Sequence, residues 1–348
     1  FNQLRFFNID ANAFRPHLAQ IVLEKEGKAG RNLLDRAGFR AKLDFGLDAK
    51  LIGGEVLGSP DDDLDFQEVY AQYIVPIGNG LDIRFGRMNT LIGYELIESP
   101  FNANFSRTWT YSLGQPFTTV GLRFGYQFNE YVFASVGVIN GFEVLRDNNR
   151  GKTLEWLVAL TPHERLGLTF YGTFGPEQSN TADSNGNGIQ GDGSPGEDPS
   201  ADRVLAGGIL TVKATERTTF VLEAYYANDP NAITTTTARN ARWTGIAGYV
   251  IYDFNERWGL HLRGEIFEDA GGTRTCVGPG GNNTCFVGFL GTPQTLWEAT
   301  STLQYRPVPS VITRLEFRYD KSDHNPFLHG TRAANNQETL AFQAIYLF

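Results

Sequence analysis

Hydrophobic and polar residues alternate along most of the chain, in segments of about ten residues that are separated by turns or longer polar stretches. In segment 37–51, Phe39 and Leu43 fall on one face, whereas Lys42 and Asp44 fall on the other. Because successive side chains of a strand point to opposite faces, such a segment predicts a strand with one apolar and one charged face. Further segments of this kind are 119–128, 154–160, 166–174, 220–226, 258–266, 311–320 and 339–348.

Short and long connectors alternate between these segments. The short connectors are 76–80, 129–130, 161–165, 214–217, 255–256 and 306–310, and the long ones are 91–116, 143–151, 176–202, 229–239, 269–293 and 322–337. This arrangement predicts an all-β fold, a transmembrane antiparallel up-and-down β-barrel with short periplasmic turns and long extracellular loops. Counting upward and downward segments gives about sixteen strands, an even number as in single-chain bacterial barrels. No shift in composition divides the chain, so residues 1–348 are expected to form a single domain.

Composition supports this interpretation and excludes several others. Among 348 residues, 39 are Gly and 13% are aromatic, which suits strands and tight turns. No window approaches the roughly 18 consecutive apolar residues of a membrane-spanning helix. The net charge of −9, without a basic block, argues against a nucleic-acid partner. A soluble sandwich or β-helix would also alternate, but it does not explain two classes of connector and about sixteen strands.

The last segment and the region around the first long connector carry a resemblance. In 339–348, a terminal Phe348 with Tyr346 two residues earlier is similar to the C-terminal signal of bacterial outer-membrane proteins. Residues 86–95, 104–107, 115–118 and 138–142, together with Gly121, resemble the OmpL-like β-barrel porin family of Gram-negative bacteria. The resemblance implies a porin of the bacterial outer membrane but no particular solute. Since no charged stretch followed by an apolar core is present, we expect that a signal peptide has already been removed.

A barrel of about sixteen strands is too wide for side chains to fill, so a water channel remains unless something plugs it. The expected function is passive diffusion of small hydrophilic solutes or ions. Segment 91–116 carries Phe101, Phe105, Trp109 and Tyr111, which is too apolar for a loop in water. Our hypothesis is that it folds into the lumen and narrows the channel. The alternative is an extracellular loop that clasps its neighbours on the rim.

Charged residues near this loop and on the polar strand faces are the candidate pore residues. The constriction candidates are Glu95, Glu98, Arg107, Arg84, Arg87 and Arg123. The candidate pore-lining residues are Lys42, Asp44, Glu223, Arg263, Glu265, Arg314, Glu316 and Arg318, with Glu155 and Glu298 on the same wall. Opposite charges facing each other across an aqueous slit would create a transverse field that favours polar solutes. Alternatively, these residues form lateral ion pairs along the wall, and the sequence leaves the ion preference open.

Two of the long connectors, 176–202 and 269–293, are expected to be external loops with features of their own. Asp183, Asn185, Asn187 and Asp192 have the oxygen spacing of the start of a calcium loop, but Ser194 stands where such a loop has Glu. A Ca²⁺ site there and a flexible solvated loop both remain open. Cys276 and Cys285 are expected to form a disulfide, since the context is extracellular.

Other functional classes have weaker support. An enzyme would need a nucleophile or an acid pair beside a His, and no Ser pairs with His261 at a recognisable spacing. No cofactor is required. The remaining alternative is a sheath or anchor, a barrel that holds a plug, cytochrome or surface protein. Outer-membrane lipid and lipopolysaccharide are the expected surroundings, and a homotrimer is expected by analogy with other porins.

Overall fold

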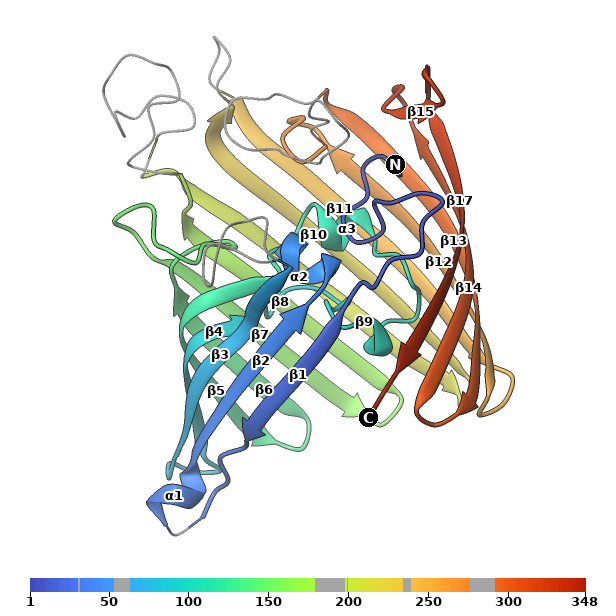
Figure 1. The fold of residues 1–348 in the computed structure, drawn as a ribbon. Coiled ribbons are helices and arrows are strands. Elements are labelled where there is room, and N and C mark those ends of the chain that lie inside the picture. Colours follow the sequence, from blue (N-terminus) through green and yellow to red (C-terminus); the bar gives the residue numbers. More distant parts are fainter. Residues whose placement is uncertain (31, 53–62, 179–197, 199, 234–238, 276–291) are drawn as a thin grey trace.

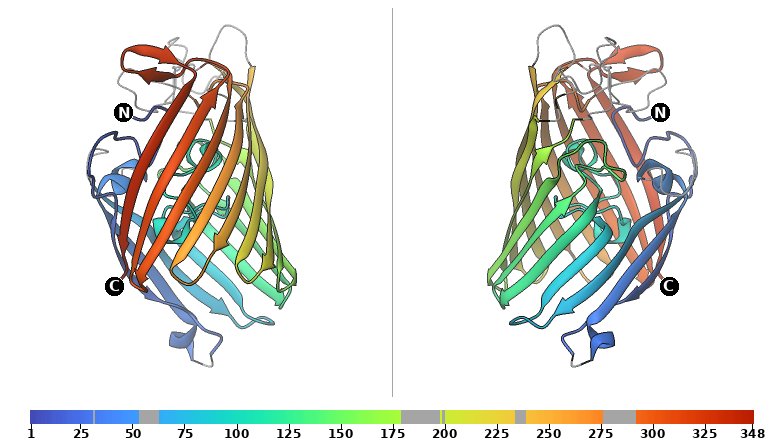
Figure 2. Two further views of the ribbon diagram at one scale, coloured as in Figure 1. Left: turned by 90° about the vertical axis from the view of Figure 1, so that its right-hand side faces the viewer. Right: turned by 90° about the vertical axis from the view of Figure 1, so that its left-hand side faces the viewer.

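A computed structural model describes the chain except residues 31, 53–62, 179–197, 199, 234–238 and 276–291. Fifteen strands form one antiparallel sheet in which each strand pairs with the next along the chain. Figures 1 and 2 show that this sheet curls into a barrel wall. The strands are β1 (Ala19–Lys25), β2 (Ala37–Phe45), β3 (Leu64–Val75), β4 (Leu81–Asn89), β5 (Thr118–Asn129), β6 (Val132–Ile139), β7 (Thr153–His163), β8 (Leu166–Pro176), β9 (Asp202–Thr215), β10 (Thr218–Ile233), β11 (Arg239–Asp253), β12 (Trp258–Asp269), β13 (Gln294–Val308), β14 (Val311–Ser322) and β17 (Asn336–Tyr346).

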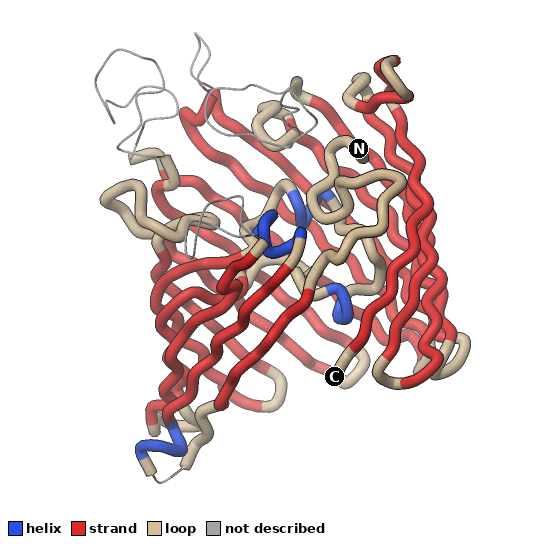
Figure 3. The backbone as a smooth tube through the Cα atoms, in the orientation of Figure 1, coloured by secondary structure: helices blue, strands red, loops and turns tan. Residues whose placement is uncertain are grey.

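Helices are few and short within the described ranges, as Figure 3 shows. They are α1 (Leu33–Arg36), α2 (Leu47–Ile52), η1 (Ser99–Phe101) and α3 (Trp109–Ser112). A separate hairpin of β15 (Phe327–His329) and β16 (Arg332–Ala334) stands at one end of the barrel. None of the helices in the described part of the chain is long and apolar enough to cross a membrane.

The sheet has two edges, β1 and β17. Because neighbouring strands are antiparallel, the first and the fifteenth strand of the row run in the same direction. Over the residues that the structure describes, these two strands are not hydrogen-bonded to each other. The N-terminal residues lie beside the upper part of β17, where the backbone N–H of Gln3 donates to Gln337 Oε1 at 2.8 Å. The sheet therefore has one strand fewer than the even number of about sixteen that we expected.

The two faces of the strands confirm the predicted alternation. On β14, the outward Leu315 and Phe317 are each 48% exposed, whereas the inward Arg314 and Arg318 are at most 2% exposed. A soluble protein shows the reverse, since it buries its apolar face. The outward apolar band and the buried polar interior are the arrangement of a barrel that lies in lipid.

One predicted strand is shorter than the pattern indicated. Alternation extended the segment to Leu51, but β2 ends at Phe45 and residues Leu47–Ile52 form α2. Gly46 lies between them with a φ of 112°, a conformation that glycine adopts without steric cost. The backbone therefore turns at Gly46, and the apolar spacing that follows belongs to a helix. The strand count also began at Leu4, but residues 1–18 contain no strand, and residues 3–8 are buried or partly buried instead.

The outward face of the barrel predicts that the cost of a charged substitution depends on its depth in the membrane. Leu262 lies halfway along β12. Its replacement by Arg is expected to lower the free energy of unfolding by about 2–4 kcal/mol, because lipid cannot solvate the charge. Val308, beside a short turn, provides the matched control, and V308R is expected to cost about 1 kcal/mol or less. Urea unfolding in phospholipid vesicles measures both values. Equal losses for the two variants would contradict a lipid-facing wall.

Candidate functional site

Segment 91–116 connects β4 to β5 and lies inside the barrel, where Figure 2 shows it in teal behind the wall. Three of its aromatic residues are buried, as their apolar character favours, and one is exposed. Trp109 and Tyr111 are each 1% exposed and Phe105 is 8% exposed, whereas Phe101 is 74% exposed. Trp109 packs in a cluster with inward-facing aromatic residues of the wall, among them Tyr225 of β10. The loop is therefore fixed to the barrel interior and is not extended over the rim.

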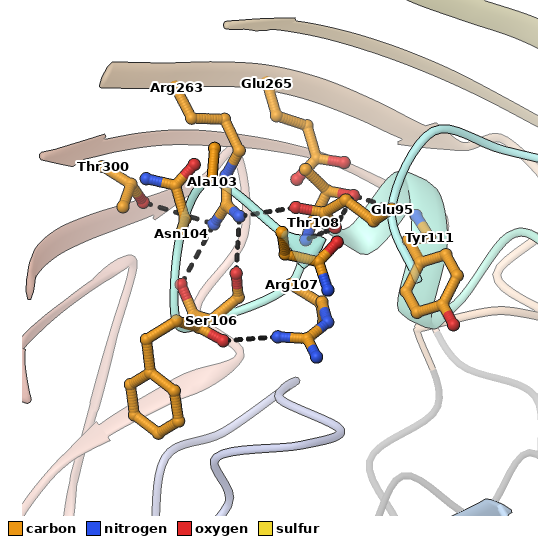
Figure 4. A network of polar contacts seen from close by, with 12 residues as sticks. Glu95, Ala103, Asn104, Ser106, Arg107, Thr108, Tyr111, Arg263, Glu265 and Thr300 are labelled. Carbon is orange, nitrogen blue, oxygen red and sulfur yellow. Dashed lines mark hydrogen bonds and ion pairs between the residues drawn. The ribbon is translucent and has the colours of Figure 1, made fainter. Parts of the chain in front are cut away.

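Arg263 of β12 joins the loop to the wall. Its Nη1 donates to Glu95 Oε1 of the loop at 2.9 Å and to the backbone carbonyl of Ser106 at 2.6 Å (Figure 4). Its Nε donates to Glu298 Oε1 of β13 at 2.6 Å. The side chain of Arg263 is fully buried. Charge-assisted hydrogen bonds of this kind are about twice as strong as neutral ones, and burial reduces screening by salt.

The ion-pair network continues along the wall from Glu298. Arg318 Nε lies 3.4 Å from Glu298 Oε2 and 2.7 Å from Asp320 Oδ1. Arg318 Nη1 also donates to the backbone carbonyl of Arg107 at 2.5 Å, and its guanidinium lies 4.8 Å from the ring centroid of Trp109. Both charge and cation–π contact therefore bind the loop to β14.

Wall carboxylates accept hydrogen bonds from the backbone of the loop. The Glu265 carboxylate of β12 accepts from the backbone N–H groups of Trp109, at 2.8 Å, and Thr110. Glu316 Oε2 of β14 accepts from the backbone N–H of Phe105 at 2.6 Å. A loop that enters a barrel brings backbone groups that must find partners once water is excluded. These glutamates supply those partners.

Arginines provide the matching donors for the loop carbonyls. Arg314 of β14 donates to the backbone carbonyl of Asn102 at 2.6 Å and to that of Ser99 at 3.0 Å. Arg107, which belongs to the loop itself, donates to the carbonyls of Ile97 and Phe105, each at 2.6 Å. Arg107 thus stabilises the loop internally.

A second anchor holds the start of the loop against β2 and β3. Lys42 donates to Glu98 and lies 2.7 Å from Glu68, and Gln67 Nε2 donates to Glu98 Oε1 at 2.8 Å. Burial raises the pKa of Glu98, but the Lys42 charge and the hydrogen bonds from Lys42 and Gln67 lower it more. The pKa of Glu98 consequently lies below its ordinary value, so the carboxylate is ionised at neutral pH.

A third anchor holds the end of the loop. Gln115 Nε2 donates to Glu223 Oε1 of β10 at 2.7 Å, and the hydroxyl of Tyr171 donates to the same oxygen at 2.6 Å. Trp243 Nε1 donates to the backbone carbonyl of Gly114 at 2.9 Å. The loop is therefore bound at its beginning, middle and end, by strands on both sides of the lumen.

The N-terminal segment also enters the barrel and contacts the loop. Arg5 Nη2 lies 2.5 Å from Asp320 Oδ2, with both side chains almost completely buried. Trp109 Nε1 donates to the backbone carbonyl of Leu4 at 2.7 Å, and the ring of Phe7 packs against Tyr111. This contribution could not be predicted, because the sequence of residues 1–18 shows no signal that distinguishes a segment inside the barrel from a strand.

Most of the predicted pore residues contact the loop or belong to it. Those that do are Lys42, Glu95, Glu98, Arg107, Glu223, Arg263, Glu265, Arg314, Glu316 and Arg318. The others make side-chain contacts with residues of the wall: Arg84 with Asp82, Arg87 with Asp65, Arg123 with Glu155, and Asp44 with Gln20. Arg84, Arg87 and Arg123, which are near the loop in sequence, pair with carboxylates of strands β4, β3 and β7, and their expected place at the constriction stays a prediction.

The predicted calcium and disulfide residues lie outside the described residues. Asp183, Asn185, Asn187 and Asp192 fall in 179–197, and Cys276 and Cys285 fall in 276–291, so both expectations stay predictions. Within the parts of the chain that are described, no group of three His, Cys, Asp or Glu side chains is arranged to hold a metal ion.

An antiparallel barrel with a charged, loop-filled interior and an apolar exterior defines the class of outer-membrane channel barrels. The chain belongs to the family described as "putative beta-barrel porin-2, OmpL-like", whose model matches residues 1–348. This confirms the resemblance in the sequence and the expectation of a channel protein that is not an enzyme. A comparison with curated proteins gives no match.

Solved porin structures share the fold. Salmonella typhi OmpF matches with a TM-score of 0.59 and 12% identity over 95% of this chain and 90% of that chain. An anion-selective porin from Comamonas acidovorans matches with a TM-score of 0.56 and 8% identity over 93% and 85%. The outer membrane channel DcaP of Acinetobacter baumannii matches with a TM-score of 0.52 and 13% identity over 88% and 78%. Identities this low establish the fold alone.

The Arg263 network predicts a large loss of stability on removal of one partner. R263Q leaves the buried carboxylate of Glu95 without its cation and leaves Glu298 with Arg318 alone, which is expected to cost about 3–5 kcal/mol. R84Q is the matched control, because Arg84 pairs with Asp82 in a partly exposed position and is expected to cost about 1 kcal/mol or less. Thermal unfolding in detergent, followed by circular dichroism, compares them. A similar melting temperature for both variants would refute the network's role.

The lowered pKa of Glu98 predicts an acid-sensitive anchor. A carboxyl group with a lower pKa in the folded than in the unfolded protein stabilises the fold above its unfolded pKa and loses this contribution as the pH falls through its folded pKa. The anchor is therefore complete at neutral pH and is lost in acid, below the ordinary value of 4.5. The melting temperature of E98Q should lie below that of the wild type at pH 7, and the difference should shrink at pH 3. A difference that is independent of pH would contradict this assignment.

Proposed function

We propose that this protein is a passive diffusion channel for small hydrophilic solutes or ions, in which segment 91–116 narrows a water-filled lumen. The carrying observation is the set of buried contacts that fixes this segment inside the barrel, with Arg263 between Glu95 and Glu298 at its centre. A segment held in this way reduces the cross-section of the pore permanently. The family and the shared fold support a channel in general.

The parts of β7–β9 that lie toward the short turns support an open path. Inward-facing Ala159 of β7, Thr169 of β8 and Thr211 of β9 are partly exposed, and Lys213 of β9 is exposed. On the loop-covered side, by contrast, Glu265 and Arg318 are buried. We infer that solutes pass along the β7–β9 side, where small and hydroxyl-bearing side chains border the lumen.

The expected homotrimer, and its contacts with lipid and lipopolysaccharide, stay predictions, since the structure contains one chain. The proposed physical mechanism is diffusion through a fixed constriction.

Deletion of residues 102–113 tests the proposal. This deletion removes α3 and the contacts to Glu265 and Arg314, so the single-channel conductance in planar bilayers is expected to rise at least about twofold. Retained β-sheet content by circular dichroism is the control for folding. An unchanged conductance would overturn the constriction. A wild-type protein that never conducts would overturn the channel itself and favour a sheath that surrounds a partner.

A further inference from the structure

A cavity of about 860 Å³ lies at the short-turn end of the barrel, and nothing in the channel proposal uses it. It is bordered by the β9–β10 turn, the β11–β12 turn and the end of β13. Arg217, Arg257 and Arg306 line it, together with Gln304 and Glu256. Each of these three arginines comes from a different turn or strand end, so the cavity collects cations that are distant in sequence.

The backbone holds the three arginines in a fixed arrangement. The N–H of Asp253 donates to the carbonyl of Arg217 at 2.9 Å, which ties the first turn to β11. The N–H of Arg306 donates to the carbonyl of Arg257 at 2.8 Å, which ties the second turn to β13. The Cα atoms that carry the guanidinium groups therefore belong to one hydrogen-bonded rim.

The loop lies directly above this cavity. Asn104 Nδ2 donates to Thr302 Oγ1 at 2.7 Å, and His261 Nδ1 lies 2.7 Å from the backbone carbonyl of Ala103. Gln304 and Trp258 line the cavity. Thr302 precedes Gln304 by only a few residues, and His261 follows Trp258 by only a few residues. The cavity thus forms a vestibule between the loop and the periplasmic end of the lumen.

The vestibule lining carries three arginines and three carboxylates, but within the described part of the chain no ion pair joins an arginine of the lining to a carboxylate. Across the described residues, Arg217, Arg257 and Arg306 have no carboxylate partner within ion-pair distance, unlike Arg263 in the interior. Of the lining carboxylates, Glu216 lies 3.3 Å from Arg165, outside the vestibule, and Asp253 lies 3.6 Å from His261. Glu256 is left as the carboxylate without such a neighbour.

We propose that this vestibule is a binding site for small solutes that carry an oxyanion, either a carboxylate or a phosphate. Guanidinium groups present planar forked donors that match both kinds of oxyanion. Because the three arginines are exposed, each contact is weak, which suits a solute that is held briefly and then released. The inference rests on the proposed function, since it assumes that solutes traverse the lumen.

Block of the channel by added anions tests the site. Citrate or inorganic phosphate is added to each side of a planar bilayer in KCl, and the fall in single-channel current is measured for the wild type and the R217Q/R257Q/R306Q variant. We expect citrate or phosphate to block the wild type, and about tenfold weaker block of the variant, as expected when charge-assisted hydrogen bonds are removed. A stronger effect of citrate indicates a carboxylate solute, and a stronger effect of phosphate indicates a phosphorylated one.

Two single variants separate the site from general charge effects. R332Q removes one positive charge from the β15–β16 hairpin, far from the vestibule in sequence, and is expected to leave the block unchanged. E256Q removes the free carboxylate and is expected to strengthen the block by about threefold, by analogy with a weak surface charge interaction. Equal block of the wild type and the triple variant, or an equal weakening by R332Q, would overturn the site.

Binding without transport distinguishes the two proposals. Isothermal titration of the detergent-solubilised protein with citrate should show about tenfold weaker binding to the triple variant. A protein that binds citrate in this way but does not conduct would refute the channel and retain the vestibule site. A protein that conducts but binds citrate equally in both forms would retain the channel and refute the vestibule site.

Discussion

The loop excludes water from the charges and backbone groups around it. The arrangement of the barrel interior depends on the need to give each of these groups a partner. Arg263 is the central case, because it contacts the loop carboxylate Glu95 and the wall carboxylate Glu298 at once. Two carboxylates buried at this position without the guanidinium would be strongly destabilising, and so would the guanidinium without them. The loop and the β12–β13 wall are therefore complementary in charge.

This constraint explains the uneven distribution of charge around the lumen. The strands that face the loop carry acids for its N–H groups and arginines for its carbonyls, as Glu265 and Arg314 illustrate. Toward the short turns, β7 and β8 present Ala159 and Thr169 instead, whereas Tyr171 and Leu205, farther along β8 and β9, pack in the cluster that holds Trp109. The sequence offered two interpretations of these charges, a transverse field across a slit and lateral pairs along the wall. Direct contact with the loop accounts for several of them, and lateral pairs such as Arg123 with Glu155 account for others.

Most strands could be predicted because period-two alternation is a local property of the chain. The extent of β2 could not, since the spacing after Gly46 fits a strand and a helix about equally over so few residues, and the φ of 112° at that glycine decides between them. The burial of segment 91–116 followed from its aromatic content. The wall residues that contact the segment could not be predicted. Arg84 and Arg263 occupy equivalent positions on polar strand faces, and only the path of the loop makes Arg263 a loop contact.

The number of anchors bears on how the constriction works. Glu98 holds the start of the loop, Arg263 its middle and Gln115 its end, and Trp109 adds the N-terminal segment through Leu4. These contacts lie on different strands, so opening the lumen would require breaking them together, and each buried pair is costly to break alone. On the proposed function, a loop held in this way acts as a fixed filter and not as a gate. Selection among solutes would then depend on the width beside the loop and on charges outside the network, which is where the unpaired arginines of the vestibule lie.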